Sequence, residues 1–505
     1  MFHVKRSARL LRRYLLLMLM AGALAAGTTG CVSTGTNPVS GNSRVYGYSW
    51  EEEQKMGAKS HKQIRAQYGF YDNDEVQQYV DEVGQRVLAE SDLRDAGTKQ
   101  KFRETDFTFT VLDSPIVNAF ALPGGYVYVS RGLMSHLNNE AQLAVVLGHE
   151  IVHVAARHAS AQAGKQQIGQ LGLIAAAVGG QAAGLPGGRI AQLGQQATKL
   201  LFLEYSRDNE EESDKRGVEY AVKAGYEASE GAEFFRTLER IQEKRGQTLP
   251  TWQSTHPDPG NRRARIPKLA QQYGEGSTVN QDAYMNTLEG MVMGENPRNG
   301  YVDDNTFFHP DMRFRFPVPR GFQVKNTAQQ VQMVEQNQRA QMVFRLAQGS
   351  SARGAAQKAA RQFQQKQGVR IRDDGSTESN GLPAYYLRIE AQSQRQRVRA
   401  LMYFVEYDGQ VFLFQAAAPA QVFSRYEDTF LRTMRGFGPL NDRDRIDVQP
   451  LRLSVEHVDR PTPFGEVARG DYELAVIGEQ DLAIINQVER NQTVDPSRPL
   501  KLPRR

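Results

Sequence analysis

Three residues able to support hydrolysis stand together in the segment VLGHEIVHVAARH, residues 146–158. His149 and His153 are four positions apart, so on a helix both imidazoles face the same way and can bind one zinc ion. Glu150 is adjacent and can polarise a water molecule held by that ion. A helix is expected over residues 140–157, which lack proline and repeat apolar residues at helical spacing. Because so short a pattern also arises by chance, the rest of the chain has to supply a third ligand.

A candidate third ligand lies in the acidic segment EYSRDNEEESDKR, residues 204–216. Glu210 and Asp214 are four positions apart, so on a helix one can bind the metal while the other orients a ligand imidazole through its free ring nitrogen. The alternative is that this acidic run is a solvated helix surface. His158 lies five positions after His153 and should point away from the ligand face of a straight helix. We expect a surface or supporting role for it.

The segment VNAFALPGGYVYVS, residues 117–130, predicts two strands joined by a Pro-Gly-Gly turn. One interpretation is a hairpin within the core. The other is an edge strand beside the zinc-binding helix, which would hold a substrate peptide by strand addition. The residues that would bind substrate in this way are Asn118, Ala119, Phe120 and Ala121.

Capping residues and the hydrophobic pattern also predict the helices and strands around these residues. Ser49, with a glutamate three positions later, forms a capping box that opens a helix to about residue 68. Residues 74–89 predict a second amphipathic helix, and alternation over 107–111 predicts a strand. Residues 161–199 are rich in Gly, Ala and Gln, and we expect helical and loop material there, either a lid or an ordinary connection.

The N-terminus has the layout of an export signal. A basic stretch followed by a short apolar run predicts a signal peptide over residues 1–30. Small residues precede Cys31, as in a bacterial lipoprotein signal, so Cys31 is the predicted lipidation site, although Thr28 departs from the usual pattern. The alternative is an uncleaved signal anchor. Residues 31–48 are rich in Ser, Thr, Gly and Asn and are expected to form a tether.

Charge and cysteine content exclude several classes of protein and site. The net charge of +5 falls to zero (5 − 5) when the five basic residues of the predicted signal are removed, so no nucleic-acid partner is expected. Cys31 is the only cysteine, which excludes an intrachain disulfide and a thiolate zinc site.

The chain of 505 residues is long enough for several domains, and its pattern changes after residue 273. Residues 274–300 predict a polar linker, and residues 301–442 an α+β domain. The strands and helices of that domain are expected at residues 384–391, 398–407, 411–416, 355–367 and 421–434. The tail, residues 443–505, is predicted to be a small module or partly ordered, and its end faintly resembles a LysM-like repeat.

Four motifs, HEIVH, NAFALPGG, SRDNEEESD and THPDPGNR, occur in this order. Together they closely resemble the HtpX/BepA-like zinc metallopeptidases, relatives of the CAAX prenyl protease. The resemblance covers roughly residues 49–272, within a predicted peptidase domain of residues 49–273. It implies a multidomain chain whose mostly α-helical gluzincin domain has a small edge β-sheet and is followed by the α+β domain and a small C-terminal module.

The resemblance also implies one zinc ion per chain and assigns roles around it. Glu211 and Glu212 would allow another register of the acidic motif. The implied zinc ligands and the acid that orients one of them are His149, His153, Glu210 and Asp214.

A further implied role concerns the THP segment. In BepA-like members such a histidine can occupy the open zinc position and hold the enzyme latent, which implies the same for His256, with Arg262 as a candidate transition-state partner. The alternative is a capping or surface histidine beside two prolines. The motif NPVSG, residues 37–41, looks like the tether of the lipoprotein branch. Helical repeats are not visible in the sequence, so the docking partners of BepA-like members are not carried over.

These features predict an exported, lipid-anchored zinc endopeptidase of the bacterial periplasm. Val32, directly after Cys31, favours the outer membrane by resemblance to sorted lipoproteins. The resemblance implies misfolded or stalled envelope proteins as substrates, including outer-membrane β-barrel precursors, while partners in assembly machinery cannot be derived. Two alternatives stay open: a chaperone-like factor whose latent site rarely cuts, and an envelope scaffold built on the C-terminal domains.

Overall fold

The computed structural model describes residues 33–167, 205–245, 252, 255–257, 261–274, 276–365, 367–392, 397–470 and 477–505. The predicted signal peptide, Cys31 and most of residues 161–199 lie outside these ranges, so the interpretations of them stay predictions. Among the described helices, none combines the length and the apolar character that a membrane span requires.

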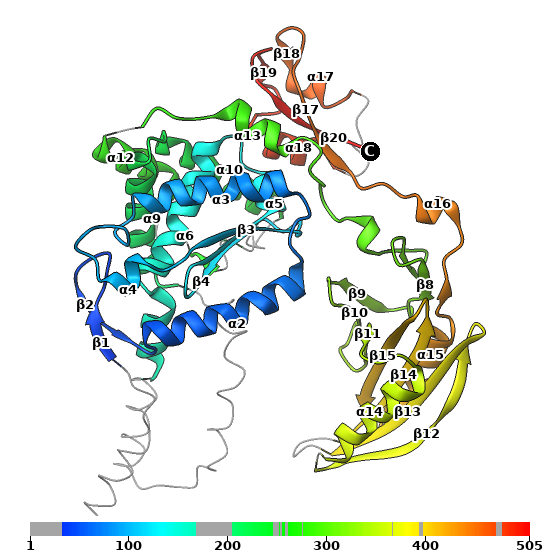
Figure 1. Ribbon diagram of the computed structural model, residues 1–505. Coiled ribbons are helices and arrows are strands. Elements are labelled where there is room, and N and C mark those ends of the chain that lie inside the picture. Colours follow the sequence, from blue (N-terminus) through cyan, green and yellow to red (C-terminus); the bar gives the residue numbers. More distant parts are fainter. Residues whose placement is uncertain are drawn as a thin grey trace, which may run out of the picture.

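The predicted peptidase domain is mostly helical, as expected, with one small sheet (Figure 1). The predicted capping box is present, because Ser49 accepts a hydrogen bond from the backbone N–H of Glu52 and the Glu52 side chain accepts one from Ser49. The elements in chain order are β1 (Ser33–Thr36), β2 (Ser43–Tyr46), α2 (Trp50–Tyr68), α3 (Asp74–Ala89), α4 (Gln100–Arg103), β3 (Thr108–Leu112), β4 (Ala119–Leu122), β5 (Tyr126–Ser130), α5 (Arg131–Met134), α6 (Glu140–Ala155), α9 (Arg207–Lys223), the 3₁₀ turn η3 (Ala228–Glu230), α10 (Gly231–Arg245), α12 (Arg262–Tyr273) and α13 (Gln281–Leu288).

The small sheet and the helix α6 form the centre of this domain. The strand order is β3-β5-β4, with β3 parallel and β4 antiparallel to β5, so β4 is an edge strand. This confirms the predicted hairpin and its placement at an edge. Every residue of α6 is buried, since α3, α9, α10 and the sheet all pack against it. A helix buried on all sides is held rigidly, which suits a helix that carries functional side chains.

The segments predicted to be a tether and a polar linker are folded in the structure. Residues 33–46 do not form a free tether but the hairpin β1–β2, which docks on the peptidase domain: Gly47 N–H donates to the Ser160 carbonyl at 2.8 Å, and Arg216 donates to the Val39 carbonyl at 2.9 Å. The predicted polar linker contains α13, whose apolar side chains enter the same core. In both cases polar composition suggested a loop, but a few well-placed apolar residues were enough to fix the segment.

The α+β domain has two sheets and two helices. Its main sheet is antiparallel, in the order β12-β13-β14-β15-β11-β10-β9, and a second sheet has the order β16-β8-β7-β6. A tight turn at Asp408-Gly409, with φ of 48° and 70°, joins the strands expected at residues 398–407 and 411–416, as this dipeptide favours. The elements are β6 (Tyr301–Asp303), β7 (Thr306–His309), β8 (Phe314–Pro317), β9 (Phe322–Asn326), β10 (Gln330–Glu335), β11 (Gln341–Ala347), α14 (Ala352–Gln364), β12 (Val369–Ser379), β13 (Leu382–Gln392), β14 (Arg397–Tyr407), β15 (Gln410–Pro419), α15 (Phe423–Arg435) and β16 (Gly438–Pro439).

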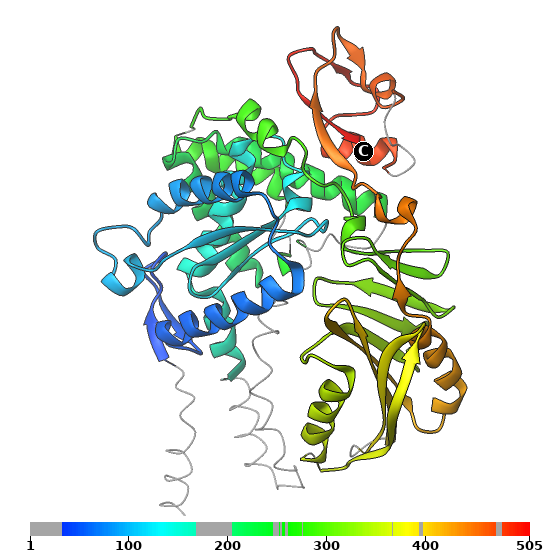
Figure 2. The same ribbon diagram turned by 45° about the vertical axis from the view of Figure 1, so that its right-hand side comes forward.

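The C-terminal residues form a small module that returns to the peptidase domain (Figures 1 and 2). Its apolar side chains belong to the same buried cluster as those of α6 and α10. Lys501 is fully buried there and donates hydrogen bonds to the Ser135 and Leu137 carbonyls, both at 2.7 Å. The elements are α16 (Arg443–Ile446), β17 (Arg452–Glu456), β18 (Thr462–Pro463), α17 (Phe464–Val467), α18 (Glu479–Ile485), β19 (Thr493–Val494) and β20 (Leu500–Arg504).

Candidate metal centre

The close crossing of α6 and α9 brings the two predicted halves of the site together. Gly148 and Gly217 face each other at the crossing, and a Cβ built on Gly148 would lie 2.6 Å from the Gly217 carbonyl oxygen. Any larger residue at either position would push the helices apart. The glycine pair therefore sets the distance between His149 on one helix and the acidic segment on the other.

Four buried side chains, His149, His153, Glu210 and His256, converge near this crossing, and one nitrogen or oxygen atom from each lies within 4.8 Å of the other three. Nε2 of His149 lies 3.0 Å from Nε2 of His153 and 3.2 Å from Nδ1 of His256. A carboxylate oxygen of Glu210 lies 3.2 Å from His256 Nδ1. Three imidazoles and a carboxylate form a donor set typical of zinc.

The contacts of Nδ1 in His149 and in His153 show that this donor set fits a cation. His149 Nδ1 lies 3.0 Å from Asp214 Oδ1, and His153 Nδ1 lies 2.9 Å from His158 Nδ1. A carboxylate can only accept, so Nδ1 of His149 carries a proton, and Nε2 is the atom that presents a lone pair to a metal ion when the ring is neutral. With His153 donating through Nδ1 in the same way, two lone pairs point at one spot, which is unfavourable unless a cation lies between them.

The support of His149 is a dense ionic cluster. The Arg262 Nε donates to Asp214 Oδ2 at 2.9 Å, a further Arg262 nitrogen contacts Glu210, and Arg265 also contacts Asp214. Burial alone would lower the pKa of His149, but the bonds to Asp214 and Glu210 and their charges raise it to about 9. Without a metal ion the ring is therefore protonated on both nitrogens at neutral pH, and a bound metal ion would replace the proton on Nε2. Burial opposes ionisation of Asp214 and Glu210 as well, yet the cationic neighbours hold the pKa of both below the usual range. These acids are therefore anionic at neutral pH.

The support of His153 is a relay. Nε2 of His158 lies 2.8 Å from Glu212 Oε2, and Glu212 also accepts hydrogen bonds from Arg44 at 2.8 Å and Asn37 at 3.1 Å. His158 can thus donate to Glu212 and accept from His153. The pKa of His158 is lowered by burial, and that of His153 is well below its usual range because burial outweighs the charge of Glu210.

The position of His158 corrects the expectation of a straight helix end. Arg157 adopts a left-handed backbone, with φ of 57°, which ends α6 and turns His158 back toward His153. Arg157 is held there by Glu53, whose Oε1 lies 2.9 Å from its Nε, and by the ring of Tyr46, 3.9 Å from the guanidinium. Of the two roles predicted for His158, the supporting role is confirmed by its contact with His153, and the surface position is wrong because the residue is fully buried.

His256 is the fourth side chain of the buried group. It is 1% exposed and its ring stacks on Trp252, with centroids 4.7 Å apart. It is therefore not a surface histidine. Its Nε2 has no hydrogen-bond partner among the described residues and lies 3.5 Å from Glu150 Oε1.

Glu150 is the buried acid nearest in sequence to the two motif histidines. Neither of its carboxylate oxygens has a hydrogen-bond partner in the described part of the chain, and burial raises its pKa. A buried carboxyl group without a partner is costly. Its presence here indicates a place where water or substrate is to be bound.

Two of the remaining predicted residues, Ala121 and Arg262, lie beside this group, whereas Phe120 stacks on Tyr128 in another apolar cluster. Ala121 on β4 lines a small cavity together with His153 and Tyr205, so the edge strand borders the site. Arg262 is engaged with Glu210 and Asp214, while its remaining guanidinium nitrogen has no hydrogen-bond partner among the described residues.

Sequence reasoning missed the aromatic walls and the relay. Tyr205 stacks on His153 with ring centroids 4.0 Å apart, as Trp252 does on His256. The glycines on the two helices were the available signal for the crossing. Nothing local marked Tyr205 as a neighbour of the site, and Glu212 was considered only as an alternative ligand, not as the partner of His158.

Comparison with known proteins agrees with this geometry. Residues 74–270 match the model of Peptidase family M48. The mitochondrial metalloendopeptidase OMA1 of Bos taurus is 36% identical over 176 residues, 34% of this chain and 33% of its own. A putative beta-barrel assembly-enhancing protease of Vibrio cholerae is 32% identical over 207 residues, 40% of each chain. The Escherichia coli beta-barrel assembly-enhancing protease is 28% identical over 301 residues, 57% of this chain and 59% of its own.

The matches thus span between one third and about three fifths of the curated relatives. Among solved structures, LpqN of Mycobacterium tuberculosis, described as involved in cell envelope biogenesis, aligns with a TM-score of 0.22 and 16% identity over 25% of this chain and 81% of its own. The family match covers the helices that carry His149, Glu150, His153 and Glu210. Residues 74–270 form a domain of peptidase family M48, the metallopeptidases that include the HtpX/BepA-like enzymes.

Proposed function

We propose that this chain is a zinc-dependent endopeptidase of the bacterial cell envelope. The observation that carries the proposal is the convergence of two imidazole lone pairs, fixed by Asp214 and by His158, on a spot shared with Glu210. Such a spot is a cation site, and its donor set favours zinc. Zinc bound there would lower the pKa of a water molecule and polarise the scissile carbonyl.

Three protein groups around that spot have separate roles in the reaction. The Glu150 carboxylate takes a proton from the attacking water and transfers it to the leaving amine, and its raised pKa suits both steps. Asp214 keeps the proton on Nδ1 of His149 throughout. Arg262, with one free guanidinium nitrogen, is the candidate partner for negative charge on the substrate carbonyl.

The edge strand β4 supports the role proposed for Asn118, Ala119, Phe120 and Ala121. Its outer edge is unpaired among the described strands, and it borders His153 through Ala121. An extended substrate can pair with it by strand addition, which presents a peptide bond to the site without demanding a particular side chain.

His256 supports a latent resting state. Its imidazole contacts Glu210 and lies between His149 and Glu150, where the substrate has to bind. It therefore has to swing aside, together with Trp252 on which it stacks, before cleavage can occur.

The location and substrates follow from the predicted leader and from relatives named for beta-barrel assembly. We place the protein in the periplasm, anchored through lipidated Cys31, most simply in the outer membrane. Its substrates would be misfolded or stalled envelope proteins. Because His256 lies inside the site, two alternatives with little cleavage stay open: a chaperone-like assembly factor and an envelope scaffold.

The decisive experiment compares wild-type protein with Glu150→Gln and His256→Ala on a permanently unfolded protein. We expect slow cleavage by wild type, faster cleavage by His256→Ala, and none by Glu150→Gln. Equal cleavage by wild type and Glu150→Gln would refute the mechanism. Absence of cleavage even in His256→Ala would favour the chaperone-like alternative.

Metal content tests the ligand assignment separately. Glu210→Ala should lose bound zinc, whereas Glu211→Ala is a matched control, because Glu211 is 58% exposed and faces away from the histidines. Retained zinc in Glu210→Ala with loss in Glu211→Ala would show that the register is wrong.

A further inference from the structure

A groove outside the metal centre gathers the exposed apolar side chains of the molecule. In the described part of the chain, three large apolar side chains are exposed: Ile116 (45%), Val302 (44%) and Leu346 (49%). All three line one groove of about 980 Å³ between the peptidase domain and the α+β domain. Exposed apolar residues are normally scattered, so their concentration in one concavity indicates a binding surface.

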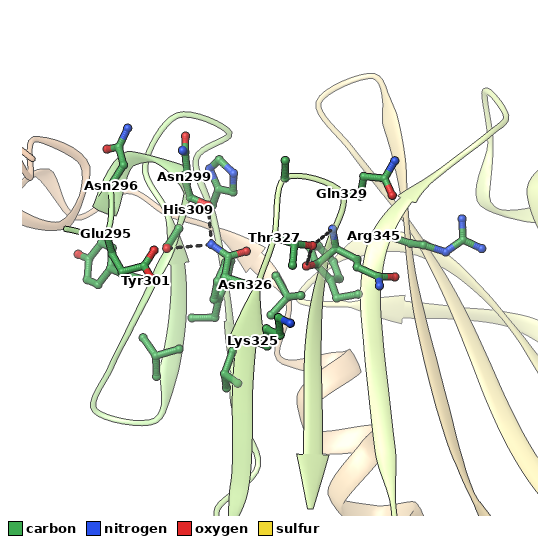
Figure 3. A pocket seen from close by; sticks show the side chains of 18 of the residues that line it. Glu295, Asn296, Asn299, Tyr301, His309, Lys325, Asn326, Thr327, Gln329 and Arg345 are labelled. Carbon is green, nitrogen blue, oxygen red and sulfur yellow. Dashed lines mark hydrogen bonds between the residues drawn. The ribbon is translucent and has the colours of Figure 1, made fainter. Parts of the chain in front are cut away.

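The two walls of the groove are held together by hydrogen bonds. Asn299 donates to Asp113 at 3.1 Å, and Arg131 donates to the Val292 carbonyl at 2.9 Å, which ties the peptidase wall to the segment that leads into β6. Asn326 at the end of β9 donates to the carbonyls of Asn299 and Gly300 (Figure 3). The groove is therefore formed before any ligand arrives.

The groove is bordered by two sheet edges. In the described chain β9 ends the seven-stranded sheet and β6 ends the four-stranded sheet. An edge strand presents backbone N–H and C=O groups to an incoming extended chain. Leu346 lies on the same sheet face as the buried Phe344, two positions earlier, so the groove offers apolar contact next to unpaired backbone. That combination fits an extended apolar polypeptide.

The groove is also continuous with the proposed substrate strand. Ile116 stands three positions before Ala119, the first residue of β4. A chain bound antiparallel to β4 runs from its Leu122 end to its Ala119 end, so its C-terminal continuation emerges beside Ile116. The next surface it meets is the groove.

We infer that this groove binds an extended, apolar segment of the polypeptide substrate, C-terminal to the part that pairs with β4. The inference rests on the proposed peptidase function and names the substrate class: unfolded chains with an apolar strand-forming segment beyond the cleavage region. The groove is an anchoring site for substrate and leaves the chemistry at Glu150 unchanged.

The test uses three synthetic peptides in the His256→Ala background. One is just long enough to pair with β4, one adds an alternating Val-Thr segment at its C-terminus, and one adds the same segment at its N-terminus. We expect the C-terminal extension alone to lower KM by about tenfold, the effect of burying one or two apolar side chains, with kcat unchanged. Leu346→Glu and Val302→Glu should abolish that gain. Ser424→Glu, on the exposed face of α15 outside the groove, is the matched control and should retain it.

Each outcome decides a different point. A gain that persists in Leu346→Glu, or that the N-terminal extension gives equally, would overturn the inference while leaving the peptidase intact. If Leu346→Glu loses binding of the fluorescent fatty acid cis-parinaric acid but not of the peptide, the groove is a lipid site and the inference is wrong. If no peptide is cleaved, the proposed function fails. Binding is then measured by fluorescence anisotropy of the labelled, C-terminally extended peptide on Glu150→Gln, with and without Leu346→Glu. Weaker binding with Leu346→Glu would support a chain in the groove, and equal binding would overturn the inference.

Discussion

The two sides of the metal centre hold similar histidines by different means. His149 is backed directly by Asp214, a carboxylate that two arginines from α12 neutralise. His153 is backed by a neutral imidazole, His158, and only beyond that by the carboxylate of Glu212. Both arrangements fix the proton on Nδ1, but the second needs one more residue to do so.

The two sides also differ in what they depend on. The His149 side is built from α9 and α12, within the segment that matches the peptidase family. The His153 side reaches the hairpin β1–β2 through Arg44 and Asn37, which follow the predicted lipidation site Cys31 by 13 and 6 positions in the sequence. The difference indicates a rigid support on one side and, on the other, a support that responds to how the N-terminal hairpin is docked.

The largest effect is expected from removing the direct support. Asp214→Ala leaves Arg262 and Arg265 without their shared carboxylate in a buried place and frees the His149 ring. We expect zinc affinity to fall by about 100-fold and the free energy of unfolding to fall by about 3–5 kcal/mol. Competition with a chelator and denaturant unfolding measure the two effects. Unchanged affinity would show that Asp214 does not orient His149.

Removing the relay should have a smaller effect. His158→Ala leaves His153 free to choose its tautomer, but Tyr205 still packs on the ring. We expect about a tenfold loss of zinc affinity. His457→Ala, an exposed histidine of the C-terminal module, is the matched control and should leave affinity unchanged. A loss equal to that of Asp214→Ala would remove the distinction between the two sides.

The sequence predicted the support of His149 but not the support of His153. His149, Glu210 and Asp214 follow from four-residue spacing on two helices, a local property that survives folding. The capping box at Ser49 and the Asp408 turn were predictable for the same reason. These elements depend only on neighbours in the chain.

The His153 side could not be read in this way. The turn at Arg157 is stabilised by Glu53, which lies 104 positions earlier, and no glycine marks it. The Glu212 carboxylate looked like part of a solvated acidic run because its partners, Arg44 and His158, come from distant segments. Contacts of this kind are set by tertiary packing and leave no periodic signal.

Detaching the hairpin from the relay should have a modest effect. Arg44→Ala removes one of three partners of Glu212, and the ion pair is partly exposed at its arginine end. We expect a two- to threefold loss of zinc affinity, the size typical of such a pair, and a weaker loss at high salt. Lys101→Ala, which breaks the exposed pair with Glu51, serves as the control. If Arg44→Ala has no effect even at low salt, the hairpin does not influence the site.

The smallest effect on zinc affinity is expected for a change at Lys501. Such a change tests whether looser packing of α6 affects the site when the supports of both histidines are intact. Burial, and secondarily the charge of Arg498, holds the pKa of Lys501 well below 10.5. As pH falls below 10.5 the unfolded chain gains this proton and the folded chain does not, so stability should decline with falling pH until the lower folded pKa is reached, and stay level below it.

Lys501→Met should remove that slope, measured as the difference in unfolding free energy between pH 10 and pH 7, while zinc affinity stays unchanged. The Lys501 amine donates to the Ser135 and Leu137 carbonyls just before α6, so the substitution loosens the start of α6 without touching the partners of either histidine. Loss of zinc affinity in Lys501→Met would mean that the two sides respond to the packing of α6 as a whole and that their separate supports contribute little.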